Sequence, residues 1–151
     1  SQVQIINVAC NERITTYNNG ISYKEKRNII DVLKNNKLIY GYSTYWNAQI
    51  LTSMSNVTIK ILPIQTENGH IVPFYSLNYI DSFSADNYNG KTFVLLSTEE
   101  YSEWVVNNVL INEEIEPVEV IESNGYIILI FPYNIAQELE YFPYNESFYA
   151  P

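Results

Sequence analysis

Hydrophobic and polar positions alternate along several short segments of this 151-residue chain, and elsewhere the hydrophobic positions recur with helical spacing. Alternating or continuous short apolar runs predict β-strands, because successive side chains of a strand point to opposite faces of a sheet. The segments predicted to be strands are Val3–Ala9, Leu38–Tyr42, Val57–Gln65, His70–Tyr75, Lys91–Leu96, Pro117–Glu122 and Tyr126–Phe131.

Three helices have start signals in the sequence. Ser22 with Glu25, and Ser97 with Glu100, have the spacing of a capping box, in which the serine and glutamate side chains each bind a free N–H of the first turn. Thr44 is expected to cap a third helix, Thr44–Ser55. The positions expected to form the faces of these helices are Ile29, Ile30 and Leu33, then Trp46, Ile50, Leu51 and Met54, then Tyr101, Trp104, Val105 and Asn108. A short last helix is predicted over Asn134–Leu139.

Four of the five glycines follow an asparagine, a pair that favours tight turns because both residues tolerate positive φ. Asn68-Gly69 and Asn124-Gly125 each lie between two predicted strands and therefore predict two hairpins. The helix after Thr44 joins two predicted strands as a right-handed βαβ crossover. We therefore expect an α/β fold, with α+β as the alternative, in which about three helices cover a mixed sheet. Residues 1–151 are expected to form a single soluble domain that ends in a loosely ordered aromatic tail over 141–151.

The formal net charge is −9, and it is unevenly distributed. All eight basic residues lie at or before Lys91, whereas eleven acidic residues and no lysine or arginine follow it. This balance excludes a nucleic-acid surface, which needs clustered basic side chains, and it predicts an acidic face built by the C-terminal part. The single cysteine, Cys10, excludes a disulfide scaffold and is expected in the core.

Residue patterns that carry catalysis are mostly missing. The sequence has no glycine-rich phosphate loop and no G-x-S-x-G motif, and its only histidine, His70, adjoins a predicted turn and is expected to be solvated. Asp81 and Asp86 lie in a polar stretch that is expected to be an ordinary loop, and the glutamates between Glu113 and Glu116 are expected to form a solvated connection. No catalytic residue, metal ligand or cofactor is predicted.

The most unusual segment, Tyr40–Thr52, places aromatic residues around the junction between a strand and a helix. Gly41 permits a close approach of the backbone to a neighbour. Aromatic rings pack against the C–H faces of sugars, and the first turn of a helix offers free N–H groups to a polar ligand. The candidate binding residues are Tyr42, Tyr45, Trp46 and Asn47. The alternative is that these rings simply pack in the core around the crossover.

Part of this segment resembles a stretch in large bacterial membrane proteins. The resemblance is carried by a helix followed by Tyr40-Gly-Tyr42, Thr44-Tyr-Trp-Asn-Ala48, Leu51-Thr52, Ser55-Asn56 and Ile59-Lys-Ile61, and by the closing strand Gly125–Phe131. It covers roughly residues 23–64 and that strand. The proteins that it resembles are polytopic and glycosyltransferase-C-like, and a soluble domain follows their transmembrane helices.

The resemblance implies an extracytoplasmic domain, excised from a bacterial membrane protein that would move sugars from polyprenyl-phosphate donors. Its partners would be the parent transmembrane region and a glycan or lipid-linked sugar. The acidic loop residues with which such enzymes catalyse transfer have no counterpart in this chain, so no catalytic role carries over.

We therefore expect a non-catalytic accessory domain that binds a glycan or acceptor at the aromatic junction. One alternative is a structural or protein-interaction domain with an acidic docking face. Another is a free-standing hydrolase that uses Asp81, Asp86 or the C-terminal glutamates.

Overall fold

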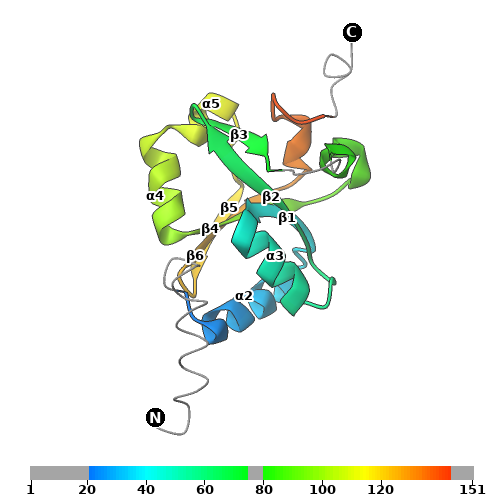
Figure 1. Ribbon diagram of the computed structural model, residues 1–151, viewed down its shortest axis with the longest axis vertical. Coiled ribbons are helices and arrows are strands. Elements are labelled where there is room, and N and C mark those ends of the chain that lie inside the picture. Colours follow the sequence, from blue (N-terminus) through cyan, green and yellow to red (C-terminus); the bar gives the residue numbers. More distant parts are fainter. Residues whose placement is uncertain (1–20, 75–79, 144–151) are drawn as a thin grey trace, which may run out of the picture.

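A computed structural model describes residues 21–74 and 80–143, which fold around a central β-sheet (Figure 1). The strands are β1 (Tyr40–Thr44), β2 (Lys60–Glu67), β3 (His70–Pro73), β4 (Thr92–Ser97), β5 (Glu119–Ser123) and β6 (Tyr126–Phe131). The helices are α2 (Tyr23–Asn35), α3 (Tyr45–Met54), α4 (Thr98–Val106) and α5 (Val109–Glu113). The predicted strand Val3–Ala9, Cys10 and residues 144–151 of the predicted tail lie outside the described residues.

The six strands lie in the order β3-β2-β1-β4-β6-β5. β1 is parallel to β2 and to β4, whereas β2–β3, β4–β6 and β5–β6 are antiparallel pairs. The mixed sheet and its helices confirm the predicted α/β fold. The crossover and both hairpins are also confirmed, since α3 links β1 to β2 and the turns Asn68-Gly69 and Asn124-Gly125 have positive φ at both residues.

Both faces of the sheet are covered by other elements. Phe93 and Leu95 of β4 pack in a cluster with residues of α2 and α3, whereas Val94 and Leu96 pack on the opposite face with Trp104 of α4. All six residues of β4 and all six of β6 are buried, because these strands have packing partners on both sides. Strands of this kind have continuous rather than alternating apolar sequences.

The helix starts are as predicted, but one buried face is not. The capping boxes of α2 and α4 are both present. Thr44 occupies the N-cap position of α3 without a side-chain cap hydrogen bond. The predicted face is confirmed at Leu51, which is buried, but it is wrong at Trp46, which is 53% exposed. Asn47 and Ala48 are buried on the helix as well. The side-chain amide of Asn47 forms hydrogen bonds with residues beneath the helix, so this side of α3 faces the interior.

The helix after Ser97 is shorter than the predicted face implies. It ends at Val106, and Asn108, with φ of 55°, starts the separate helix α5. Trp104 is buried, but Val105 is 56% exposed. The left-handed residue redirects the chain, so the apolar positions on either side of it no longer share one face.

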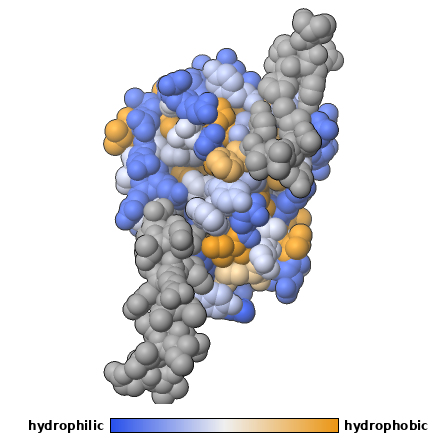
Figure 2. Space-filling model, viewed as in Figure 1, coloured by the Kyte–Doolittle hydropathy of each residue, from blue (hydrophilic) through white to orange (hydrophobic). Residues whose placement is uncertain are grey.

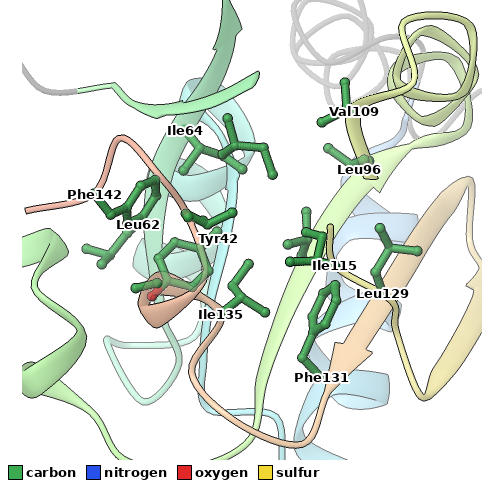
Figure 3. Packing of buried hydrophobic residues seen from close by; sticks show 14 of the residues in the cluster. Tyr42, Leu62, Ile64, Leu96, Val109, Ile115, Leu129, Phe131, Ile135 and Phe142 are labelled. Carbon is green, nitrogen blue, oxygen red and sulfur yellow. The ribbon is translucent and has the colours of Figure 1, made fainter. Parts of the chain in front are cut away.

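Tyr42 lies in the core near the C-terminal end of the described chain (Figure 3). Its hydroxyl donates to Asn134 Oδ1 over 2.6 Å, and its ring meets the ring of Phe142 edge-on. Asn134 also caps a 3₁₀ helix, Ile135–Gln137, where a short helix is predicted. Phe142 is fully buried although it falls in the segment predicted to be a loose tail, because it fills the space between Tyr42 and Phe83.

β1 and β4 approach each other closely at Gly41. Gly41 is paired with Phe93, and a Cβ atom built on Gly41 would lie 2.6 Å from both the ring and the carbonyl oxygen of Phe93. Atoms at that distance overlap, and the carbonyl oxygen belongs to a strand that cannot shift alone. The predicted role of Gly41 in a close backbone approach is confirmed.

The substitution Gly41→Ala is therefore expected to lower the free energy of unfolding by at least about 2 kcal/mol, measured by urea denaturation. Gly90→Ala is the control, because its added methyl group would meet the movable end of the Tyr88 side chain. It should lower the free energy of unfolding by less than about 1 kcal/mol. Equal losses of unfolding free energy in the two variants would show that β1 and β4 do not approach each other unusually closely at Gly41.

Lys26 is a charged residue without exposed surface. Its Nζ donates to the carbonyl oxygen of Ile21 over 2.6 Å. Burial lowers the pKa of Lys26 from 10.5 to about 8, against a smaller opposing effect of Glu25. Between these two pH values the unfolded chain binds more protons than the folded chain, so this group makes the fold more stable as the pH rises.

The substitution Lys26→Met should consequently stabilise the chain at pH 7 by on the order of 2 kcal/mol. The advantage over the wild type should shrink between pH 8 and pH 10.5, as the buried lysine loses its proton in the folded state. Urea denaturation of both proteins across this range measures it. A difference that does not change with pH would contradict the stated cause.

Candidate functional site

The candidate site lies at the edge of the sheet where three parallel strands end, at Thr44 of β1, Glu67 of β2 and Ser97 of β4. β2 and β4 lie on opposite sides of β1, so the strand order reverses between β1 and β4. In open α/β sheets such a reversal leaves a crevice beyond the carboxyl ends of the strands, and ligands bind there. Helices α3 and α4 begin at this edge.

A crevice of about 290 Å³ occupies this position. Its size is near the lower end of small-molecule sites, which suits a ligand of one or two rings. Aromatic, carboxylate and neutral polar side chains line it, together with one aliphatic side chain. The lining residues are Thr44, Tyr45, Ile64, Gln65, Thr66, Phe74, Glu100, Glu103 and Trp104.

The aromatic residues of the crevice come from three separate elements. Tyr45 is the first residue of α3, Phe74 follows β3, and Trp104 belongs to α4. The rings of Tyr45 and Phe74 are in contact, with centroids 4.9 Å apart and a tilt of 49°. Tyr45 is 37% exposed, whereas Trp104 is 6% exposed. Tyr45 and Phe74 therefore supply accessible aromatic surface, and Trp104 supplies the packed wall.

A network of hydrogen bonds fixes the two helix starts relative to each other. Asn47 Nδ2 donates to Thr44 Oγ1 over 3.1 Å and to Glu100 Oε1 over 3.3 Å. The buried Tyr126 hydroxyl donates to Asn47 Oδ1 over 3.3 Å. Glu100 Oε1 also accepts from the backbone N–H of Ser97 over 2.8 Å. The network joins β1, α3, α4 and β6 directly beside the crevice.

Burial keeps the Tyr126 end of this network uncharged. Burial raises the pKa of Tyr126, and the negative charges of Glu100 and Glu25 raise it further. The phenol therefore remains protonated and donates its hydrogen bond to Asn47.

The four predicted binding residues have different environments. Tyr45 lines the crevice. Trp46 is exposed but is not among the lining residues, and its ring meets that of Tyr45 edge-on with centroids 5.2 Å apart. Asn47 is 3% exposed and serves the network. Tyr42 is 1% exposed and bonded to Asn134, so the prediction that it contacts a ligand is wrong: its side chain points into the core.

Most of the other lining residues were not predicted from the sequence. Gln65 and Thr66 come from β2, whereas Glu100, Glu103 and Trp104 come from α4. The sequence predicts the helix start at Ser97, but only the strand order places it beside the aromatic junction. Parallel strands that each precede a helix are a signal for such a shared edge.

His70 and Glu113 form a second cluster, which supports one wall of the crevice. Both were expected to be solvated, but Glu113 is buried and accepts from the Ile71 N–H over 3.2 Å. Its Oε1 lies 2.6 Å from His70 Nδ1. Asn112 Nδ2 also donates to the carbonyl oxygen of Gly69. These bonds hold the β2–β3 hairpin against α5, so the prediction of a solvated loop is wrong at Glu113.

Asp81 and Asp86 are exposed residues of two 3₁₀ helices, Ile80–Phe83 and Ala85–Asn87. Neither residue lines the crevice. Across residues 21–74 and 80–143, no group of three or more histidine, cysteine, aspartate and glutamate side chains is placed to hold a metal ion.

Comparison with known proteins assigns no family. The chain matches none of the protein-family models, curated proteins or solved structures with which it was compared. None of the helices in the described part of the chain is long and apolar enough to cross a membrane. The resemblance to membrane glycosyltransferases stays a prediction.

The network predicts a specific role for Asn47. Asn47→Ala removes partners of both Glu100 and Tyr126 and should lower the free energy of unfolding by about 1–3 kcal/mol in urea denaturation. Gln49→Ala, on the exposed side of the same helix, should change it by less than about 0.5 kcal/mol. A loss at Asn47 no larger than that at Gln49 would exclude a structural role of the network.

Proposed function

We propose that this chain is a binding domain that holds a carbohydrate in the crevice between the ends of β1 and β2 and the helix α4. The observation that carries the proposal is the composition of the crevice, in which accessible aromatic rings adjoin hydroxyl, amide and carboxylate groups. A sugar ring presents C–H groups on its faces and hydroxyl groups around its edge. The rings of Tyr45 and Phe74 can pack against the faces of the sugar. Its hydroxyl groups can form hydrogen bonds with the polar side chains of the crevice, which are Thr44, Gln65, Thr66 and the two glutamates.

The wider setting of this proposal rests on the resemblance described above. We propose that the chain is an accessory domain of a bacterial membrane glycosyltransferase-like protein, located on the extracytoplasmic side. There it would hold a glycan, an acceptor or the sugar of a lipid-linked donor near the parent transmembrane region. The transfer itself would belong to the parent protein.

A hydrolase is a second candidate, because Glu100 and Glu103 line the same crevice. Glycoside hydrolysis uses two carboxyl groups on either side of the bond that breaks. The two glutamates are one turn apart on a single helix and therefore belong to the same wall. Glu100 Oε1 is also occupied by Ser97 and Asn47. This arrangement favours binding over cleavage, and recovery of intact glycan after incubation distinguishes the two.

A protein-interaction domain is the other alternative. Exposed Val105, Val106 and Ile111 on α4 and α5, near several exposed glutamates in the sequence, favour it. On the side of the molecule shown in Figure 2, however, hydrophobic residues form separate small patches within a mainly hydrophilic surface. Separate patches of this kind are common on proteins without a partner.

Binding of glycans to the full chain, screened on an array and measured by calorimetry, tests the proposal. Tyr45→Ala should weaken binding about five- to thirtyfold, because it removes the accessible ring that the sugar face would cover. Trp46→Ala should weaken binding less, since Trp46 does not line the crevice and instead contacts Tyr45.

Tyr23→Ala is the matched control, because Tyr23 lies on α2 and does not line the crevice. It should leave the affinity unchanged. Binding that survives Tyr45→Ala in a folded protein would refute the site, and absence of binding to any glycan would refute the function.

A further inference from the structure

We infer that the crevice selects a sugar that carries a protonated amine over neutral and anionic sugars. The inference rests on the proposed function and specifies the chemical class of its ligand. It depends on the acidic side chains that line the crevice, on the hydrogen bonds that hold one of them in position, and on the aromatic rings beside them.

The charged residues that line the crevice are all acidic. Glu100 and Glu103 are both among the lining residues, and none of the described residues that line the crevice is a lysine, arginine or histidine. An anionic group, such as a phosphate or a carboxylate, would enter without a side-chain partner of opposite charge. An ammonium group would meet two carboxylates within one helical turn.

The Glu100 carboxylate is held in position before a ligand arrives. Its Oε1 accepts hydrogen bonds from the Ser97 N–H and from Asn47 Nδ2. Two donors to one oxygen restrict rotation of the side chain. A ligand amine therefore finds a fixed acceptor on Glu100 and a second carboxylate on the more exposed Glu103.

The aromatic rings of the crevice, like its carboxylates, favour a positively charged ligand. The face of an aromatic ring attracts cations within about 6 Å, and Tyr45, Phe74 and Trp104 line the same crevice. A ring that packs against a sugar face thus also favours a positive charge on that sugar. Neutral sugars gain the packing without this electrostatic contribution.

The partial positive charges at the N-termini of α3 and α4 weaken the attraction for a cation but do not cancel it. Each helix N-terminus is equivalent to about half a positive charge, so α3 and α4 together contribute about +1. The two lining carboxylates carry about −2 when ionised. The sum at the crevice is negative, and a lipid-linked sugar would have to enter by its sugar end with the phosphate outside.

Calorimetry with two disaccharides of the same linkage separates charge from shape. Cellobiose and the β-1,4-linked glucosamine disaccharide differ in the hydroxyl or amine at the second carbon of each ring. Below the pKa of the sugar amine, at low ionic strength, the full chain should bind the amine disaccharide at least about fivefold more tightly. Added salt should reduce this preference, because the charges at the mouth of the crevice are screened.

Two single-charge variants locate the effect. Glu103→Gln should reduce the preference for the amine by about threefold to fivefold while cellobiose binding changes little. Glu99→Gln removes the same charge from the same helix, but at a residue that does not line the crevice, and should leave the preference unchanged.

Each outcome decides between the two proposals. Equal affinity for the two disaccharides overturns the amine selection and leaves carbohydrate binding in place. Binding of neither disaccharide, nor of any other glycan, overturns both. Equal losses in Glu103→Gln and Glu99→Gln also overturn the inference, because the preference would then come from the overall charge of the protein.

Discussion

The close approach of β1 and β4 at Gly41 is the constraint on which the site depends. A side chain at Gly41 would overlap the ring and backbone of Phe93, so only glycine lets these two parallel strands pair at this point. Their pairing places β4 on the side of β1 opposite β2, and the strand order reverses there. The reversal leaves an opening beyond the strand ends, and α3 and α4 begin on either side of it. The crevice is thus a result of strand pairing deep in the sheet.

Two polar clusters then keep the shape of the crevice. The bonds from Asn47 to Glu100 and from Tyr126 to Asn47 tie the starts of α3 and α4 to the sheet. On the other side, Glu113 holds the β2–β3 hairpin through His70 and the Ile71 N–H. Buried polar groups lose much free energy when they are unpaired, so both clusters favour one arrangement of the walls. A site with such fixed walls loses little conformational entropy when a small ligand binds.

The distribution of charge connects the composition of the chain with its proposed ligand. The C-terminal part contains eleven acidic residues and no lysine or arginine, and α4 brings two of those acidic residues into the crevice. An acidic crevice with aromatic walls is unsuited to the phosphate of a lipid-linked sugar but suited to sugar hydroxyl and amine groups. The placement of both carboxylates on one helix distinguishes this arrangement from a hydrolytic pair, which needs one carboxyl group on each side of the bond.

The local features of this protein follow from its sequence alone. Capping boxes at Ser22 and Ser97, the Asn-Gly hairpins and the crossover through α3 depend on neighbouring residues, and all were predictable. The position of Tyr45 at a helix start predicts its place in the site. The three-dimensional fold is needed to show that Tyr42 is buried against Asn134 and that Trp46 points outward. It is also needed to show that Phe74, Glu100 and Glu103 line the same crevice as Tyr45. These outcomes depend on strand order and on which side of α3 faces the sheet. Strand order and the orientation of α3 are set by contacts between residues that lie tens of positions apart. The pattern of neighbouring residues in the sequence does not specify such contacts.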